Sequence, residues 1–151
     1  MKHSYLVARA ERWLRNSFHC RVVLTELVAY TVTGEIPDAI GWVNGRSILV
    51  ECKTSRSDFF ADKKKTARNP CLNGLGHWRF YLAPQDLIRP DELPEGWGLY
   101  EIHGRQIRHA GGDKYVNAKI PPFKSCRESE VAMLVSALAR IPTPSNTVSG
   151  G

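Results

Sequence analysis

The chain has 151 residues, of which 42% are hydrophobic and 24% are charged, and this composition is typical of an ordinary globular domain long enough to bury a core. No apolar run approaches the roughly 20 residues of a membrane span, so we expect no membrane partner. The formal net charge of +6 favours a polyanionic partner. The excess is uneven, because residues 53–68 hold six Lys or Arg against two Asp.

The cysteines and the N-terminal segment bear on compartment. Cys20, Cys52, Cys71 and Cys126 show no CxxC pairing, and free thiols fit a reducing compartment. The first residues lack the uninterrupted apolar core and the small-residue cleavage site of a secretory signal. We therefore expect a cytoplasmic protein.

Periodicity and turn residues predict a mixed α/β chain. In chain order we expect a helix over 4–17 capped by Ser4, a long strand over 20–33, a hairpin of strands 36–43 and 47–53, a helix over about 58–68 capped by Ser57, a strand over 78–83, a second hairpin over 98–109 around His103-Gly104, and a helix over about 126–140. Residues 1–141 are expected to form one domain, and 142–151 a disordered tail.

Apolar side chains predict which helix faces are buried. The first helix should bury Leu6, Ala10, Trp13 and Leu14; the second should pack Phe59, Phe60 and Ala67 on the sheet; the last, with a capping box of Ser125 and Glu128, should bury Val131, Leu134, Val135 and Leu138. Trp78, Phe80 and Leu82 should be core, with Arg79 and Tyr81 on the other face of their strand.

The most informative feature is the first hairpin. Asn44-Gly45 is the strongest short signal for a two-residue type I′ turn. If these two residues form the turn, opposed positions sum to 89 and Asp38 faces Glu51. Strand alternation then places Lys53 on the same face as Glu51, with Cys52 pointing into an apolar face.

Two carboxylates held together repel each other and need a compensating cation. A hard, oxygen-liganded divalent metal such as Mg²⁺ would supply it, and a lysine beside such a metal is typical of phosphodiester hydrolysis. Two other interpretations remain open: Asp38 as a turn cap after Pro37, and Glu51 with Lys53 as a surface ion pair of little energetic value.

Pro37-Asp38, Glu51-Cys52-Lys53 and the helix that follows resemble the PD-(D/E)XK nuclease superfamily. The stretch ECKTSRSDFFADKK is further similar to the MmcB-like DNA repair nuclease branch and related phage or bacterial proteins. The resemblance covers about residues 20–110. It implies a restriction-endonuclease-like αβββαβ core, in which helices flank a mixed central sheet.

The resemblance also implies roles for the site residues. Asp38 and Glu51 would ligate Mg²⁺ or Mn²⁺, the Cys52 carbonyl would add an oxygen, and Lys53 would orient the attacking water. Many members carry another acid before Pro-Asp; Glu26 is the best match and Glu35 the second, while an exposed strand acid is the other interpretation of Glu26. Many also carry a glutamine or tyrosine on the following helix, and residues 58–68 have neither.

Basic residues near this motif, and one serine at the N-terminus of the following helix, are candidate phosphate contacts. The basic residues are Arg56, Lys63, Lys64, Lys65, Arg68 and Arg79, and the serine is Ser57. A solvated helix face is the alternative for the lysines, and a plain helix cap is the alternative for Ser57.

The resulting prediction is a metal-dependent nuclease that hydrolyses DNA with structural or weak sequence specificity, in repair, recombination or phage DNA processing. The alternatives are a non-catalytic nucleic-acid-binding module on the same fold and a protein-interaction module with an acidic partner. The sequence does not exclude RNA as the substrate, and it does not distinguish a monomer from a homodimer.

Overall fold

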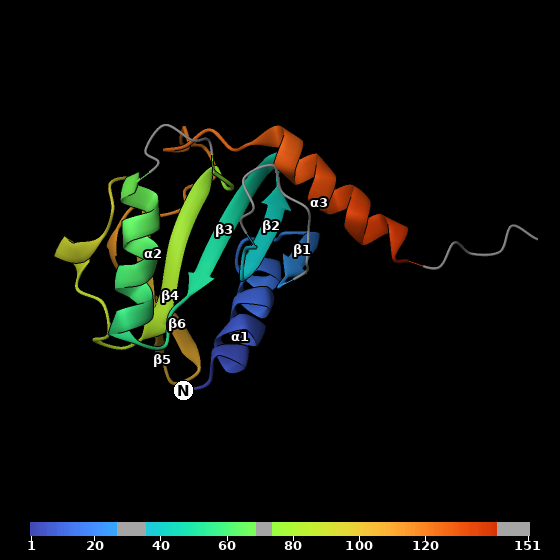
Figure 1. Ribbon diagram of the computed structural model, residues 1–151. Helices are drawn as coiled ribbons and strands as arrows, with labels where there is room; N and C mark the ends of the chain where they lie inside the picture. The colour runs from blue at the N-terminus through green and yellow to red at the C-terminus, as the bar shows by residue number, and fades with distance from the viewer. Residues whose placement is uncertain (27–35, 69–73, 142–151) are drawn as a thin grey trace, which may run out of the picture.

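The computed structural model describes residues 1–26, 36–68 and 74–141, without the side chains of 65–68. Within these residues, one six-stranded sheet is flanked by three helices (Figure 1). The elements are α1 (His3–Asn16), β1 (Val22–Thr25), β2 (Ala39–Val43), β3 (Arg46–Cys52), α2 (Arg56–Arg68), β4 (Trp78–Pro84), the short 3₁₀ helix η1 (Pro90–Glu92), β5 (Gly98–His103), β6 (Gln106–Gly112) and α3 (Arg127–Ala139). The expected tail, 142–151, lies outside the described residues.

The strands follow one another across the sheet in chain order, from β1 to β6. β3, β4 and β5 run parallel, and the other neighbouring pairs are antiparallel. Helix α2 makes the crossover between the parallel strands β3 and β4. The mixed sheet and the αβββαβ order of the first elements confirm the predicted fold class.

The register of the first hairpin is as predicted. Ala39 pairs with Val50 and Val43 with Arg46, so opposed positions sum to 89. Asn44 and Gly45 both have positive φ, 52° and 74°, which a type I′ turn requires. The short turn therefore fixes which side chains share each face of β2 and β3.

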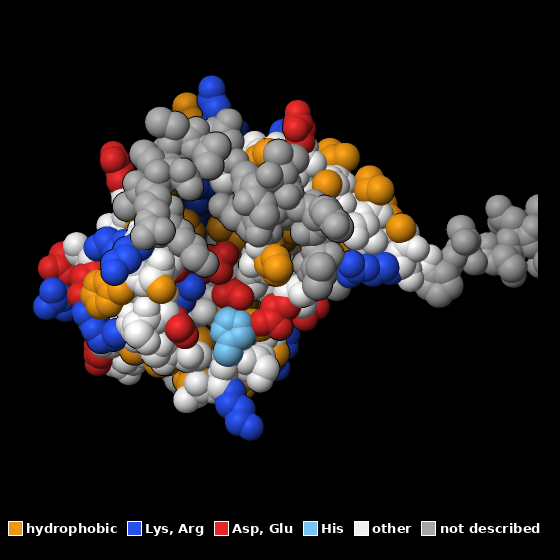
Figure 2. Space-filling model, in the orientation of Figure 1, with side chains coloured by type: hydrophobic (Ala, Val, Ile, Leu, Met, Phe, Trp, Pro, Cys, Tyr) orange, Lys and Arg blue, Asp and Glu red, His pale blue; other side chains and the backbone are white. Residues whose placement is uncertain are grey.

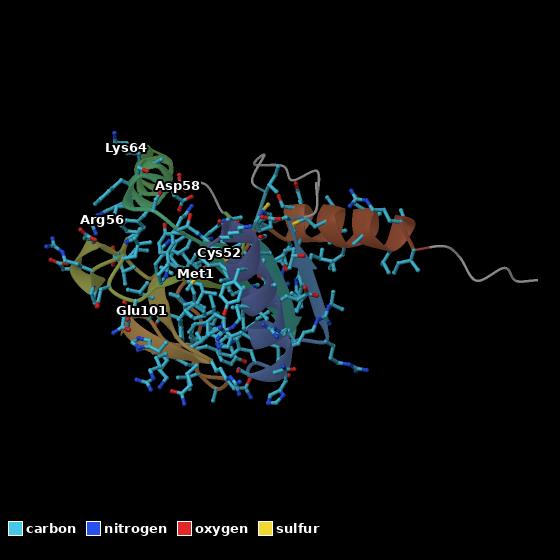
Figure 3. The ribbon with its side chains drawn as sticks, turned by 90° about the horizontal axis from the view of Figure 1, so that it is seen from below. Met1, Cys52, Arg56, Asp58, Lys64 and Glu101 are labelled. Carbon is cyan, nitrogen blue, oxygen red and sulfur yellow. The ribbon has the colours of Figure 1, made fainter. Side chains whose placement is uncertain are left out.

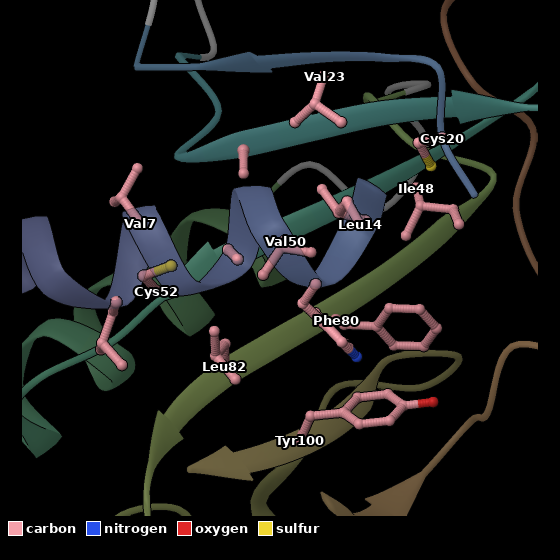
Figure 4. Packing of buried hydrophobic residues seen from close by; sticks show 14 of the residues in the cluster. Val7, Leu14, Cys20, Val23, Ile48, Val50, Cys52, Phe80, Leu82 and Tyr100 are labelled. Carbon is pink, nitrogen blue, oxygen red and sulfur yellow. The ribbon is translucent and has the colours of Figure 1, made fainter. Parts of the chain in front are cut away.

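Each face of the sheet carries its own hydrophobic cluster. On one face, α1 packs against Val50 and Cys52 of β3 and against Phe80 and Leu82 of β4 (Figure 4), as expected from the apolar face of 4–17. On the other face, Phe59 of α2 packs near Leu49 and Tyr81. Because side chains alternate along β3, Cys52 lies on the face of the sheet that α1 covers. Burial there raises the pKa of its thiol.

The predicted helix caps are wrong by one or two positions. Lys2 precedes α1 and no side chain caps it, so Ser4 lies inside the helix. Helix α2 begins at Arg56 because the Ser55 hydroxyl accepts the Asp58 N–H at 3.2 Å, and Ser57 lies in the first turn. Cys126, not Ser125, precedes α3, and no capping box forms there.

The predicted buried face of the last helix is wrong at three of its four residues. Val131, Val135 and Leu138 are more than half exposed, whereas Leu134 is partly buried against the second hydrophobic cluster, and Met133 and Glu130 are buried. Helix α3 extends past the edge of the sheet (Figure 1), and no described part of the chain covers the three exposed side chains. Phe60 of α2 is likewise exposed, contrary to expectation, and stacks under the Arg56 guanidinium at 5.0 Å.

Two strand predictions need correction. The strand expected over 20–33 is described only as Val22–Thr25, because Glu26 has a positive φ of 38° that ends regular pairing; residues 27–35 lie outside the described part. The second hairpin turns at Gly104-Arg105, since His103 still pairs with Gln106.

Among the described helices, none has the length and apolarity to cross a membrane.

A buried polar cluster fixes the start of α3 to the sheet. Glu130 is 2% exposed, and its carboxylate accepts the Trp42 indole N–H at 2.7 Å and the Ser47 hydroxyl at 3.1 Å. Arg127 donates to the same carboxylate at 3.1 Å. These three partners are all donors, which satisfies the charge of this buried acid inside the protein.

Candidate active site

Asp38 and Glu51 come together because of the hairpin register. Asp38 stands one residue before β2, next to the Ala39–Val50 pair, and so lies opposite Glu51. Its Oδ2 accepts the backbone N–H of Cys52 at 2.7 Å, and its carbonyl accepts the N–H of Glu26 at 3.1 Å. These bonds hold Asp38 beside the C-terminal end of β3, with 16% of its side chain exposed.

The environment of Glu51 opposes its ionised form. Removal from water and the neighbouring Asp38 carboxylate, which also hydrogen-bonds to it, raise the pKa of Glu51 well above the usual glutamate range. Asp62 adds to this increase, and Lys53 reduces it. The side chain therefore lacks enough nearby positive charge to balance the carboxylates around it.

Lys53 is held by residues that the sequence interpretation did not identify. Its Nζ lies 3.6 Å from Oδ1 of Asp62 in α2, and the Tyr81 hydroxyl donates to the other oxygen of Asp62 at 2.7 Å. Tyr81 pairs with Glu51 across β3 and β4 and is fully buried. The helical spacing of Asp62 from buried Phe59 was the available signal, because residues three apart share a helix face.

His3 also joins the site, from the first turn of α1. Its Nε2 lies 2.8 Å from Glu26 Oε1 and 3.3 Å from Asp38 Oδ1. Acidic side chains surround a histidine on this face of the molecule (Figure 2), and these contacts identify the group. No sequence signal near Asp38 indicated His3, because its approach depends on how α1 packs.

Three side chains of this cluster lie close enough together to share one ion. His3, Glu26 and Asp38 each offer one ligand atom, and these atoms lie within 4.8 Å of one another. Glu26, the best match for an additional acid, thus stands beside Asp38, whereas Glu35 lies outside the described residues. The Cys52 amide contacts Asp38, and the expected role of the Cys52 carbonyl as a ligand stays a prediction.

Among the predicted phosphate contacts on α2, Arg56 and Ser57 have partners within the protein, whereas Lys64 faces solvent. Arg56 binds Glu92 at 2.6 Å and lowers the pKa of that glutamate to about 2, and Ser57 lies 3.1 Å from the Ser55 hydroxyl. Lys64 is exposed and points away from the sheet (Figure 3), and Lys63 precedes it. The side chains of Lys65 and Arg68 are outside the described part.

Arg79 lies away from the acid cluster. Its Nε donates to the Gly76 carbonyl at 2.9 Å, and its guanidinium stacks 4.0 Å from the Phe123 ring. It pairs with Leu49, two positions before Glu51, so β4 presents Tyr81 and not Arg79 to the site. The structure therefore brings together Asp38, Glu51 and Lys53 but leaves Arg79 outside this group.

Comparisons with known proteins bear on the fold alone. No family model matches the chain, and no curated protein matches it either. Its structure is similar to the solved SPO1766 protein of unknown function from Silicibacter pomeroyi, with a TM-score of 0.58 and 23% sequence identity. The match covers 93% of this chain and 89% of that one, so nearly the whole arrangement of elements is shared.

Proposed function

We propose that this chain is a metal-dependent nuclease that hydrolyses DNA phosphodiester bonds. One observation carries the proposal: Asp38 and Glu51 are opposed across β2 and β3, and the pKa of Glu51 is raised by burial and by Asp38. Such a pair is costly without a cation. It supports the interpretation as a site over that of Asp38 as a simple turn cap.

The residues fit a small divalent cation such as Mg²⁺ or Mn²⁺. Asp38 and Glu51 supply oxygen ligands, and Glu26 and His3 stand within reach of Asp38. A bound cation would lower the pKa of a coordinated water and stabilise charge on a phosphate oxygen. Imidazole is a better ligand for Mn²⁺ than for Mg²⁺, so participation of His3 would favour Mn²⁺.

Lys53 is the residue that meets the reacting phosphate in this proposal. Its side chain is 12% exposed, and Asp62 holds the ammonium group on the same face as Glu51. From there it orients a water molecule for attack on phosphorus and stabilises the negative charge that develops. The Tyr81 hydroxyl fixes Asp62, and Asp62 in turn holds Lys53. The lysine side chain is therefore already in position before the reaction, and ordering it adds no cost to the transition state.

The substrate class follows from charge. The net charge of +6 supports a polyanion, and Lys63 and Lys64 on α2 follow the acid cluster closely in sequence. We propose contacts to phosphates and not to bases, which gives structural or weak sequence specificity in repair, recombination or phage DNA processing. A cytoplasmic location remains a prediction of the sequence, and the sequence leaves the oligomeric state open between a monomer and a homodimer.

The test is a cleavage panel of linear, flapped, junction and single-stranded DNA, with RNA counterparts, in Mg²⁺, Mn²⁺ or chelator. We expect cleavage that requires metal and is absent in Lys53→Ala. Lys114→Ala is the matched control, since it removes an exposed lysine that lies outside both the acid cluster and α2. Salt-dependent binding without cleavage of any substrate would instead favour the non-catalytic module on this fold.

A further inference from the structure

A groove lies between α1 and the turn that joins β5 to β6, apart from the acid cluster. Its lining is Tyr5, Arg9, Arg12, Trp13, Asn16 and Ser17 from α1 and its end, with Gly104 to Arg108 from the hairpin. From Tyr5 to Asn16 the helix extends roughly 16 Å, at 1.5 Å per residue. The groove is therefore long enough to follow several units of an extended chain.

Arg9 builds this groove. It is only 8% exposed, and its guanidinium donates to the Gly104 and Arg105 carbonyls, each at 2.9 Å. It also donates to the Tyr5 hydroxyl at 2.7 Å. Arg9 thus fastens the hairpin turn to the helix, and its donors are used within the protein.

The other charged residues that line the groove are arginines, one of which, Arg108, also pairs with Glu101 across β5 and β6. Arg12, Arg105 and Arg108 are exposed, and none of the described lining residues is an acid. Arg108 is oriented by Gln106, whose side-chain oxygen accepts its Nε and terminal nitrogen at 3.0 and 2.7 Å. Three arginines on two elements, without carboxylates among the lining, favour a ligand with several negative charges.

An aromatic ring accompanies these arginines. Tyr5 is 44% exposed, and the Arg9 guanidinium lies 5.6 Å from its ring centre. An exposed ring held beside a row of arginines is the combination that binds single-stranded nucleic acid, because bases stack on the ring and phosphates pair with the cations. In a duplex the bases are already stacked, so such a ring would have no use.

We propose that this groove binds a single strand of nucleic acid, with phosphates on Arg12, Arg105 and Arg108 and a base against Tyr5. This inference rests on the proposed function, which names nucleic acid as the class of ligand. Tyr5 is two residues from His3, which contacts Asp38, so a strand in the groove reaches the first turn of α1 beside the acid cluster.

The experiment measures binding without cleavage. A labelled oligothymidine of about 12 nucleotides is titrated by fluorescence anisotropy in chelator, over a salt series. The triple variant Arg12→Ala, Arg105→Ala, Arg108→Ala should bind at least about 10-fold more weakly. Its slope of log affinity against log salt should fall by about 2, at about 0.7 for each contact to a single strand.

The control variant is Arg21→Ala, Lys114→Ala, Lys124→Ala, which removes three exposed cations outside the groove. It should keep most of the affinity; an equal loss in both triples would overturn the proposal. Tyr5→Leu should weaken oligothymidine binding but not binding of inorganic polyphosphate, and an equal effect on both ligands would exclude stacking. Melting curves confirm that each variant is folded.

Failure of the groove and failure of the proposed function have different signatures. If the parent cleaves DNA and the groove triple binds as tightly as the control, the groove proposal fails and the nuclease proposal stands. If the groove triple loses binding but the parent cleaves no substrate with either metal, the nuclease proposal fails and the groove stands.

Discussion

A glutamate lies near each end of β3, and the groups that surround the two side chains differ. Near Ser47, at the start of the strand, Glu130 accepts hydrogen bonds from Trp42, Ser47 and Arg127. Near its end, Glu51 faces Asp38 and lies close to Asp62, and its pKa is raised. One acid is surrounded by donors and the other by acids.

The difference separates a structural acid from a candidate catalytic one. A buried carboxylate that receives several hydrogen bonds is balanced by the fold itself. A carboxylate placed beside others stores repulsion that only a bound cation or a proton relieves. The contacts of Glu130 assign it to the docking of α3, whereas a metal-dependent reaction at Glu51 is our proposal, and each prediction below tests that division.

The largest expected effect is on cleavage. Asp38→Asn, Glu51→Gln and Lys53→Ala should each reduce the rate by at least about 100-fold, since each removes a charge contact worth about 3 kcal/mol in the transition state. Single-turnover cleavage by folded, purified variants measures this. Full activity of Asp38→Asn would remove the acid pair from the mechanism.

The converse change at the start of β3 should affect stability. Glu130→Ala leaves the Trp42 indole N–H and the Ser47 hydroxyl without their acceptor, at a cost of about 3 kcal/mol in the free energy of unfolding. Urea unfolding at pH 7 in chelator measures it. Glu51→Gln should cost nothing in the same assay; a loss equal to that of Glu130→Ala would erase the contrast between the two ends.

Asp62 tests whether the position of Lys53 matters. Asp62→Asn keeps an acceptor for the Tyr81 hydroxyl but removes the charge 3.6 Å from Lys53. We expect about a 10-fold loss of cleavage rate, as is usual for residues that orient a catalytic group. Asp58→Asn, which changes an exposed acid on the same helix, is the control. Equal rates for the two variants would show that Lys53 needs no support from Asp62.

A smaller effect concerns pH. Because the pKa of Glu51 is raised in the folded state, this carboxyl keeps its proton in the metal-free folded protein at pH values, above about 4.3, where it loses the proton in the unfolded chain. The contribution of Glu51 to the free energy of unfolding is present at low pH and is lost as the pH rises through the pKa that Glu51 has in the folded protein. Glu51→Gln should therefore melt close to the parent near pH 4 and on the order of a few degrees higher near pH 8. A difference that does not change with pH would contradict the raised pKa.

The sequence predicted the local part of the site and missed the long-range part. Asn44-Gly45 and strand alternation determine the positions of Asp38, Glu51 and Lys53, because both rules act over a few residues. His3 and Asp62 reach the cluster only through the packing of α1 and α2 on the sheet. The spacing of Asp62 from Phe59 indicated the face of α2 but not its distance from Lys53, and no pattern in the sequence indicated the approach of His3.

The same limit explains the error at α3. Periodicity identified Val131, Val135 and Leu138 as one apolar face, and they do share a face. Periodicity says which side of a helix is apolar, but not whether another element covers that side. Here the helix runs past the edge of the sheet, so the face stays exposed in the described part of the chain.

The most direct test of the acid pair as a metal site needs no substrate. Parent, Asp38→Asn and Lys64→Ala are melted with Mn²⁺ and with chelator. At a hundredfold excess over its dissociation constant, a metal that binds only the folded protein adds about 2.7 kcal/mol, which raises the melting temperature by several degrees. The account predicts this rise in the parent and in Lys64→Ala, its absence in Asp38→Asn, and a metal-free Asp38→Asn as stable as the parent or slightly more so. An equal rise in all three would contradict it, as would a large loss of stability in metal-free Asp38→Asn, which would make Asp38 a structural cap.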